Sequence, residues 1–359
     1  MKSVGHSSLR LLTPADLRSI FDAFALLETG VSVCLLPFKN QKPEIEDIPL
    51  SSPALGFYSS GTTGTPKICW RAWADLKTEI RNAPEYAKWT WASSFVPCSF
   101  AGVQAALQAW AAGGDILSLD SAMEENWNLL ASRLIHAVSC TPTFLDLLLQ
   151  HRSSAHASWN PRQITLGGEP LRPVTGGRFQ KAFPQTRFTI IYASAELGVL
   201  LKTHRMDGWF ELASLEKRFP KWRIDHDELA VWTGNSWQAT RDLVELNNDL
   251  LRVIGRADAV ANVAGSKVSL DEVARLAEQV PGVRRALAFA ESNSVSGQIV
   301  ALRFTPEDGL GGREVRERLE IHLRERLRKE AWPRRWEIGP IHLGPNTKRS
   351  HEPGKPTTH

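Results

Sequence analysis

The chain has 359 residues, of which 42% are hydrophobic and 23% are charged, so it has the composition of an ordinary globular protein with a sizeable core. Its formal net charge of +4 comes from 43 basic and 39 acidic residues spread along the chain. This weak and dispersed basicity argues against a nucleic-acid-binding protein and is compatible with an anionic small-molecule substrate.

We expect neither a targeting signal nor a membrane span. Met1 opens no charged and then apolar leader, and no apolar run approaches the roughly eighteen residues of a membrane span. We therefore predict a cytoplasmic protein without a membrane span.

The N-terminal part predicts a helix followed by a strand. Apolar residues recur at helical spacing, with Thr13 as N-cap, Pro14 at the first helical position and Gly30 as the stop. A strand is expected in 31–38.

From residue 53 to about Val199, apolar runs of strand length alternate with helical segments, which indicates an α/β sheet architecture. The strands are expected near 55–60, 91–98, 115–119, 136–140, 163–168 and 187–193, and helices in 143–152 and 174–183. The four cysteines form no CxxC or Cys/His ligand set, so reduced, buried thiols are expected at Cys34, Cys69, Cys98 and Cys140.

After Gly208 the pattern changes to short strands separated by turns, as in a small β region. These strands are expected in 227–232, 239–246 and 250–255, and the segment 255–260 reads as a connector to a compact α+β unit. In that unit we expect helices in 269–280 and 313–330 and strands in 284–291, 298–304 and 335–339.

The polar segment Tyr58–Lys67, "YSSGTTGTPK", has the composition of a phosphate-binding loop. Its small residues let an anion approach the backbone, and they can turn several N–H and hydroxyl groups towards one point. Pro66 stands where a Walker loop needs glycine, so that motif is excluded. A flexible hairpin tip is the alternative interpretation. The candidate phosphate-binding residues are Ser59, Ser60, Gly61, Thr62, Thr63, Gly64 and Lys67.

This string resembles the phosphate loop of the adenylate-forming superfamily, which contains acyl- and aryl-CoA synthetases, adenylation domains and luciferases. Two further segments are similar to that family in the same order, "LGGEPL" at 166–171 and "IYASAELG" at 191–198. The resemblance implies that the backbone around Gly167, Gly168 and Glu169 lies against adenine. It also implies that Tyr192, with Ala193 beside it, stacks on the base and that Glu196 coordinates Mg²⁺.

The resemblance continues into the C-terminal part. "ATRDLVEL" is similar to the family's Thr-Gly-Asp region, which implies that Asp242 accepts the ribose hydroxyls. The segment 254–273 is similar to the family's hinge, with Arg256 near the ribose, Asp258 at the hinge and Gly265 in the loop used for thiol transfer.

The family also uses a lysine near its C-terminus, which stabilises the reacting carboxylate and α-phosphate together with Lys67 and Glu196. Lys348 in "GPNTKRS" is our first candidate, because it follows the strand "RWEIG" at about the expected offset. Lys355 in "PGKP", which keeps the usual preceding glycine, is the alternative. Taken singly, each of these residues also has an ordinary structural interpretation, as core, turn or solvated tail.

Three departures from the family pattern affect these expectations. Ala193 and Ala195 replace a glycine and a threonine, so a hydroxyl near the phosphate is missing. Phe100 replaces a histidine and is expected, with Val103 and Gly167, to line the acyl pocket, although simple core packing is equally compatible. Only about fifty residues precede the phosphate loop, which implies a shortened N-terminal subdomain whose exposed face a homodimer partner could cover.

We therefore expect an α/β fold: a large N-terminal α/β domain with mixed sheets in 1–255, a hinge at 256–258 and a small mobile α+β domain in 259–359. The implied reaction is ATP-dependent activation of an aryl or acyl carboxylic acid, with Mg²⁺, followed by transfer to a thiol, most simply CoA. The abbreviated central region is most similar to o-succinylbenzoate-CoA ligases and short aryl-acid ligases. Transfer to a carrier protein or an amine is one alternative, and a non-catalytic nucleotide-binding protein is another.

Overall fold

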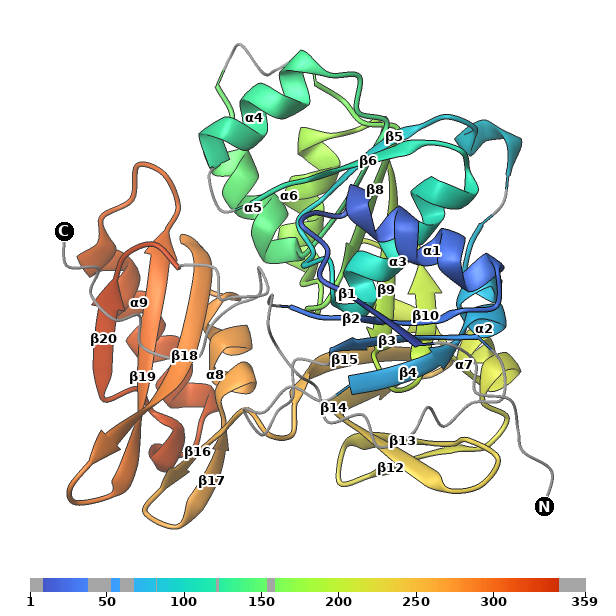
Figure 1. The fold of residues 1–359 in the computed structure, drawn as a ribbon. Coiled ribbons are helices and arrows are strands. Elements are labelled where there is room, and N and C mark those ends of the chain that lie inside the picture. Colours follow the sequence, from blue (N-terminus) through green and yellow to red (C-terminus); the bar gives the residue numbers. More distant parts are fainter. Residues whose placement is uncertain are drawn as a thin grey trace. The chain divides into compact units, whose positions relative to one another are not determined.

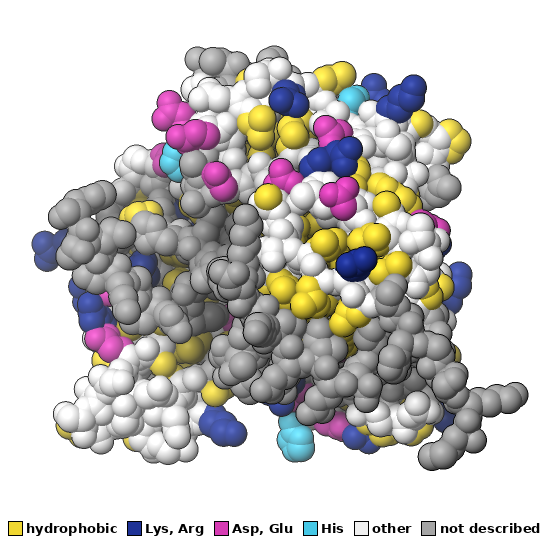
Figure 2. Space-filling view, viewed as in Figure 1, with side chains coloured by type: hydrophobic (Ala, Val, Ile, Leu, Met, Phe, Trp, Pro, Cys, Tyr) yellow, Lys and Arg dark blue, Asp and Glu magenta, His cyan; other side chains and the backbone are white. Residues whose placement is uncertain are grey.

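The computed structural model describes residues 9–37, 53–58, 68–81, 83–120, 123–153 and 159–341 (Figure 1). The chain divides into two units, Met1–Asp207 and Gly208–His359. The described part of the first unit exposes basic, acidic and apolar side chains interspersed on the face that Figure 2 shows. No helix in the described ranges has both the length and the hydropathy needed to cross a membrane.

The larger sheet of the first unit has the strand order β10-β9-β8-β7-β5-β6. All neighbouring pairs are parallel except β9 with β10. The strands are β5 (Thr90–Ser93), β6 (Asp115–Ser118), β7 (Ala137–Cys140), β8 (Gln163–Gly167), β9 (Arg187–Ser194) and β10 (Gly198–Thr203). The connecting helices are α3 (Phe100–Ala111), α4 (Met123–Ser132), α5 (Pro142–Gln150) and α6 (Pro173–Ala182). The predicted α/β alternation is therefore confirmed.

The strand order decides which helices share a face of this sheet. The connection from β5 to β6 runs one way across the sheet, and the connections from β6 to β7, β8 and β9 run the other way. Because parallel crossovers are right-handed, α3 lies on one face and α4, α5 and α6 on the other (Figure 1). The carboxyl ends of the parallel strands meet at one edge, where ligands of such sheets usually bind.

A smaller sheet has the order β1-β2-β3-β4, with β4 antiparallel to β3. Its elements are β1 (Leu9–Leu12), β2 (Ser32–Leu35), β3 (Ala54–Tyr58) and β4 (Ile68–Ala72), accompanied by η1 (Arg18–Ile20), α1 (Phe21–Glu28), α2 (Trp73–Thr78) and η2 (Pro84–Tyr86). Tyr58, the last residue of β3, pairs with Ile68, the first residue of β4. The two residues that flank segment 59–67 are thus paired with each other.

The first helical segment begins later than the sequence predicted. Thr13 and Pro14 lie outside any helix, and a turn of 3₁₀-helix at Arg18–Ile20 leads into α1. The competing cap is Asp16, whose carboxylate accepts the Ser19 N–H at 2.8 Å while its main-chain oxygen accepts the Ser19 hydroxyl. The predicted stop is confirmed, because Gly30 follows the helix with a φ of +91°.

The second unit contains two sheets. The first has the order β11-β15-β14-β13-β12 and is antiparallel throughout. Its elements are β11 (Trp209–Glu211), α7 (Leu212–Arg218), β12 (Trp222–Asp225), β13 (Glu228–Trp232), β14 (Trp237–Asn247) and β15 (Leu250–Arg256). The short strands predicted after Gly208 are therefore confirmed.

The second sheet of this unit has the order β17-β16-β19-β18, with β20 pairing β19. Its elements are β16 (Val260–Val263), β17 (Ser266–Ser269), α8 (Leu270–Ala277), β18 (Val283–Asn293), β19 (Gly297–Pro306), α9 (Gly312–Arg326), η4 (Lys329–Ala331) and β20 (Arg335–Ile338). Buried side chains of α8, α9 and the sheet form a core of their own. The connector between the two sheets begins at the predicted hinge, and the domain division at 256–258 remains a prediction.

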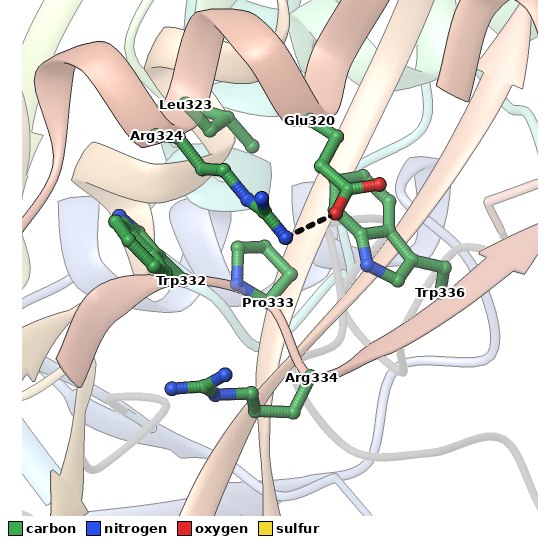
Figure 3. A pocket seen from close by; sticks show the side chains of 7 residues that line it. All are labelled: Glu320, Leu323, Arg324, Trp332, Pro333, Arg334 and Trp336. Carbon is green, nitrogen blue, oxygen red and sulfur yellow. Dashed lines mark hydrogen bonds and ion pairs between the residues drawn. The ribbon is translucent and has the colours of Figure 1, made fainter. Parts of the chain in front are cut away.

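A pocket beside α9 is lined by two tryptophans and charged side chains (Figure 3). Arg324 pairs with Glu320 at 2.6 Å, and its guanidinium lies 5.3 Å from the ring centre of Trp332. Because Arg324 already contacts a carboxylate and an aromatic face, we interpret the pocket as part of the packing between α9 and the segment that leads to β20. None of the predicted site residues lines it.

Candidate active site

Part of the predicted site falls outside the described residues. This part comprises the phosphate-loop candidates Ser59, Ser60, Gly61, Thr62, Thr63, Gly64 and Lys67 and the two candidate catalytic lysines Lys348 and Lys355. The strands on either side of the loop are described, so its surroundings can be built from β3 and β4. The remaining site residues are divided between the two units.

The strand that directly follows the predicted phosphate loop, β4, contacts the turn that carries Glu196. Arg71 Nη1 donates a hydrogen bond to the main-chain oxygen of Glu196 at 3.0 Å, and the Cys69 thiol lies 3.8 Å from Glu196 Oε1. The turn is also closed internally, because Ser194 Oγ accepts the Leu197 N–H at 3.0 Å. The first unit therefore places the predicted metal ligand beside the end of the predicted phosphate loop.

Glu196 is exposed, and few other possible metal ligands lie near it among the described residues. Within the described residues, no group of three or more His, Cys, Asp or Glu side chains could hold a metal ion. A single exposed carboxylate beside a phosphate loop fits Mg²⁺, which usually takes one or two carboxylates, waters and the oxygens of a bound phosphate. The residues present thus fit a metal ion that arrives with a nucleotide.

The predicted adenine-binding turn follows β8 at the same edge of the large sheet. Gly167 pairs with Ile191 on β9, next to Tyr192, and Gly168 adopts a left-handed φ of +79° that glycine allows without strain. Tyr192 is 8% exposed, so most of its ring is buried. The sequence segments at 166–171 and 191–198 thus lie on neighbouring strands.

Glu169, after this turn, caps the start of α5. Its Oε2 accepts the Thr143 N–H at 3.2 Å and a hydrogen bond from the Thr143 hydroxyl, and the Thr143 side chain is buried. Burial, and to a lesser extent the negative charge of Glu169, raises the pKa of the Cys140 thiol at the end of β7. The Glu169 carboxylate is therefore already hydrogen-bonded within the protein, to Thr143.

Two of the three residues predicted to line the acyl pocket, Phe100 and Val103, lie in α3, and the third, Gly167, ends β8. Phe100 is 8% exposed, with its ring centre 5.6 Å from that of Phe57, and Val103 is fully buried. Both belong to the hydrophobic core of the first unit, which is the alternative interpretation raised for Phe100. The half-buried side chains of Ala193 and Ala195 pack against the same core.

In the second unit Arg256, at the end of β15, binds two carboxylates. Its guanidinium lies 3.1 Å from Asp242 Oδ1 through Nη1 and 3.1 Å from Asp258 through Nε. Burial acts to lower the pKa of Arg256, but Asp258 and Asp242 outweigh it, and the pKa is raised. Asp242 is 7% exposed, so its charge is neutralised inside the protein.

The predicted thiol-transfer loop is a two-residue hairpin turn between β16 and β17. Val263 pairs with Ser266, and the turn residues Ala264 and Gly265 have φ values of +48° and +84°. Two left-handed residues form the type I′ turn that suits a twisted hairpin.

A protein-family comparison decides the membership of the chain. The model described as "AMP-binding enzyme" matches residues 14–222, which is more than half of the chain. The chain belongs to the AMP-binding enzyme family. The predicted resemblance to adenylate-forming enzymes is thereby confirmed.

Curated members of the AMP-binding family share about a quarter of their residues with this chain. The 3,4-dihydroxybenzoate–[aryl-carrier protein] ligase of Bacillus anthracis is 27% identical over 264 residues, which are 69% of this chain and 61% of that protein. The 2-hydroxy-7-methoxy-5-methyl-1-naphthoate–CoA ligase of Streptomyces carzinostaticus is 25% identical over 295 residues, 70% of this chain and 52% of that protein. The chain therefore spans 61% and 52% of the length of these two relatives.

Solved structures extend the similarity to nearly the whole fold. A variant of Escherichia coli MenE with bound OSB-AMS matches with a TM-score of 0.67 at 17% identity, over 97% of this chain and 87% of that one. The amide bond synthetase McbA from Marinactinospora thermotolerans matches with a TM-score of 0.64 at 18% identity, over 97% and 80%. At these identities the likeness shows the fold alone.

The AMP-binding family pattern also explains one irregularity of this chain. Arg241 stands where the family's Thr-Gly-Asp segment has glycine, and it keeps a left-handed φ of +59°. Its N–H donates to Glu228 Oε1 at 2.9 Å, and β14 is irregularly paired at this point. The backbone therefore retains a glycine conformation although the residue is arginine.

The sequence analysis missed the contacts of Arg71 and Thr143, and it expected a buried thiol at Cys69, which is instead half-buried and contacts Glu196. Each acts through a contact more than twenty residues away in the chain. A usable signal for Arg71 and Cys69 was the alternation of β4, which sends both side chains to one face.

Proposed function

We propose that this AMP-binding protein activates an aryl carboxylic acid with ATP. In the proposed reaction the acid's carboxylate attacks the α-phosphate, the bond between the α-phosphate and pyrophosphate breaks, and an acyl-adenylate forms. The acyl group then passes to a thiol, most simply that of CoA, with release of AMP. The observation that carries this proposal is the contact of β4, directly after the phosphate loop, with the turn of Glu196.

Each residue has a role that follows from its chemistry. The N–H and hydroxyl groups of segment 59–67, with Lys67, would hold the β- and γ-phosphates. Bound Mg²⁺, held by Glu196, would supply positive charge to the phosphates. Asp242, already neutralised by Arg256, would accept the ribose hydroxyls. Lys348 would stabilise the charge that develops between the carboxylate and the α-phosphate.

The aryl class of substrate is supported by the names of the relatives. Two of them are ligases of dihydroxybenzoate and of a hydroxylated naphthoate, and a Streptomyces relative with 23% identity is a salicylyl-CoA synthase. All three names describe aromatic acids that carry a hydroxyl group. We extend this substrate class, but not a particular acid, to the present chain.

A second candidate function keeps the adenylation step and changes the acceptor. The Bacillus anthracis relative is named for transfer to an aryl-carrier protein, so the thiol could belong to a carrier protein's pantetheine arm. A non-catalytic nucleotide-binding protein is a third candidate, which the alanines at 193 and 195 favour because they remove a hydroxyl from the site.

Acid-dependent exchange of labelled pyrophosphate into ATP tests the adenylation step. The panel should contain benzoate, salicylate, 2,3- and 3,4-dihydroxybenzoate, 1-hydroxy-2-naphthoate and medium-chain fatty acids. We expect exchange with at least one hydroxylated aromatic acid and none without an acid. Absence of exchange with every acid would favour the non-catalytic candidate. In the active case, CoA and a pantetheinylated aryl-carrier protein are then compared as acceptors.

A further inference from the structure

We propose that Arg71, assisted by Cys69, is a positioning residue that holds Glu196 in the orientation needed to bind the metal of the nucleotide complex. The inference rests on the proposed function, because it takes Glu196 to be the metal ligand. Neither residue belongs to the predicted nucleotide-binding set.

The alternation of β4 places Arg71 and Cys69 on one face. Ile68 and Trp70 pack with Tyr58 in a small cluster on one side of the sheet, and Cys69 packs against the main core on the other. Successive side chains of a strand point to opposite faces, so Arg71 shares the side of Cys69. Both reach the same turn, 125 and 127 residues away in the chain.

The two contacts fix different parts of Glu196. Arg71 donates to its main-chain oxygen at 3.0 Å, which holds the turn, whereas the Cys69 thiol approaches the carboxylate oxygen Oε1 at 3.8 Å. Because the guanidinium bonds the carbonyl, the carboxylate charge is left for a cation. A thiol is only a weak donor, so it can orient the carboxylate without competing strongly for it.

The neighbouring residue offers Glu196 no side-chain support of its own. Ala195, directly before Glu196, has no hydroxyl with which to bind either the carboxylate or a phosphate. Within the turn, the side-chain hydrogen bond comes from Ser194 and closes the backbone at Leu197. Among the described residues, the side-chain contacts to Glu196 come from β4, whose own position is fixed by its pairing with β3.

The test measures ligand binding rather than turnover. Isothermal titration calorimetry compares the affinity for ATP with excess Mg²⁺ and for ATP with excess EDTA, in the full chain and without acid. Arg71→Met removes the donor and keeps the length of the side chain, and Arg71→Lys keeps a charged donor. Arg187→Met is the matched control, because Arg187 begins β9 at the opposite end from Glu196 and contacts Tyr86 and His204.

We expect the affinity of Arg71→Met for MgATP to fall about tenfold or more, the usual scale for losing a group that orients a metal ligand. Its affinity for metal-free ATP should stay unchanged, Arg71→Lys should recover most of the loss, and Arg187→Met should bind like wild type. Cys69→Val should show a smaller loss of the same kind, and Cys69→Ser should restore it. This pair carries the test if Arg71→Met does not fold.

Two results would overturn the inference. Wild-type affinity for MgATP in Arg71→Met would show that Glu196 needs no such support, and an equal loss for both forms of ATP would place the effect in the phosphate loop. The pyrophosphate exchange assay separates this failure from failure of the proposed function. A wild-type chain that exchanges normally while Arg71→Met binds MgATP normally contradicts only the inference. A wild-type chain with neither exchange nor a preference for MgATP contradicts both.

Discussion

Two carboxylates of the candidate site, Glu196 in the first unit and Asp242 in the second, are held in opposite ways. Glu196 is exposed, and the arginine beside it binds its main-chain oxygen. Asp242 is 7% exposed and forms an ion pair with Arg256 at 3.1 Å. A carboxylate that must bind a cation needs an uncompensated charge, whereas one that accepts hydroxyl groups does not. The two environments are compatible with the roles proposed above, a metal ligand for Glu196 and a ribose acceptor for Asp242.

The backbone before each acidic segment differs as well. Gly168 precedes Glu169 with a φ of +79°, and Arg241 precedes Asp242 with a φ of +59°. Glycine adopts this conformation without penalty, but an L-residue with a side chain does so at a cost of roughly 1–2 kcal/mol. The turn before Asp242 therefore keeps this geometry at the cost of strain that the turn before Glu169 avoids by using glycine.

The largest expected effect concerns Lys348, the candidate for the positive charge beside the reacting carboxylate and α-phosphate. Lys348→Ala should reduce acid-dependent pyrophosphate exchange on the order of a hundredfold or more, the scale for removing one preorganised charge-stabilising group. Lys355→Ala is the matched control and should leave the rate within about twofold of wild type. The reverse result would assign the catalytic role to Lys355.

Glu196→Gln tests the exposed carboxylate. We expect exchange to fall about 10- to 100-fold because the neutral amide binds Mg²⁺ weakly. Raising the Mg²⁺ concentration should recover part of the rate, since the substitution weakens metal binding rather than the binding of ATP itself. A loss that is independent of Mg²⁺ would remove the contrast between the two carboxylates.

Asp242→Asn tests the ion-paired carboxylate. Loss of a charge-assisted hydrogen bond to a ribose hydroxyl should raise the KM for ATP roughly tenfold, with a small change in kcat. Extra Mg²⁺ should not relieve the defect. The corresponding test ligand is 2′-deoxy-ATP, which should bind wild type more weakly but should show little further loss with Asp242→Asn. A full additional loss would argue against contact between Asp242 and the ribose.

The smallest effects concern Arg241 and Gly168, the two residues with left-handed φ that precede Asp242 and Glu169. Arg241→Gly should raise the free energy of unfolding by up to about 1 kcal/mol, because relief of strain outweighs the added flexibility of glycine. Gly168→Ala should lower it by about 1–2 kcal/mol. Arg241→Ala controls for the side chain, since alanine retains the strain. Denaturant unfolding measures all three, and equal values for the glycine and alanine variants would show that backbone strain is not the cause.

Much of the fold could be predicted from the sequence because its elements are local patterns. The runs of apolar residues ending at Cys140, Gly168 and Ala193 became β7, β8 and β9, in the order that an alternating α/β pattern implies. The first helix was placed too early because Thr13 and Pro14 form a plausible start. Asp16 satisfies the backbone three residues further on, and only the structure decides between the two caps.

The site was less predictable than the fold. The motif residues could be assigned by family resemblance, but Arg71 contacts Glu196 across 125 residues of sequence, and such pairings depend on how two sheets pack. The core position of Phe100 could not be predicted either, because a residue that lines a pocket and a residue inside the core have the same apolar pattern in the sequence. The conformation of Arg241 could be suspected only from the glycine that it replaces.

The hydrogen bonds between Glu169 and Thr143 have a consequence for how an acid substrate would enter. The amino end of a helix attracts free anions, but at α5 the protein has filled that place with a carboxylate of its own. For the proposed substrate, this end of β8 is repulsive to a carboxylate and compatible with the uncharged ring. If the proposed reaction is correct, we expect the acid to bind with its ring, rather than its carboxylate, towards this end of β8.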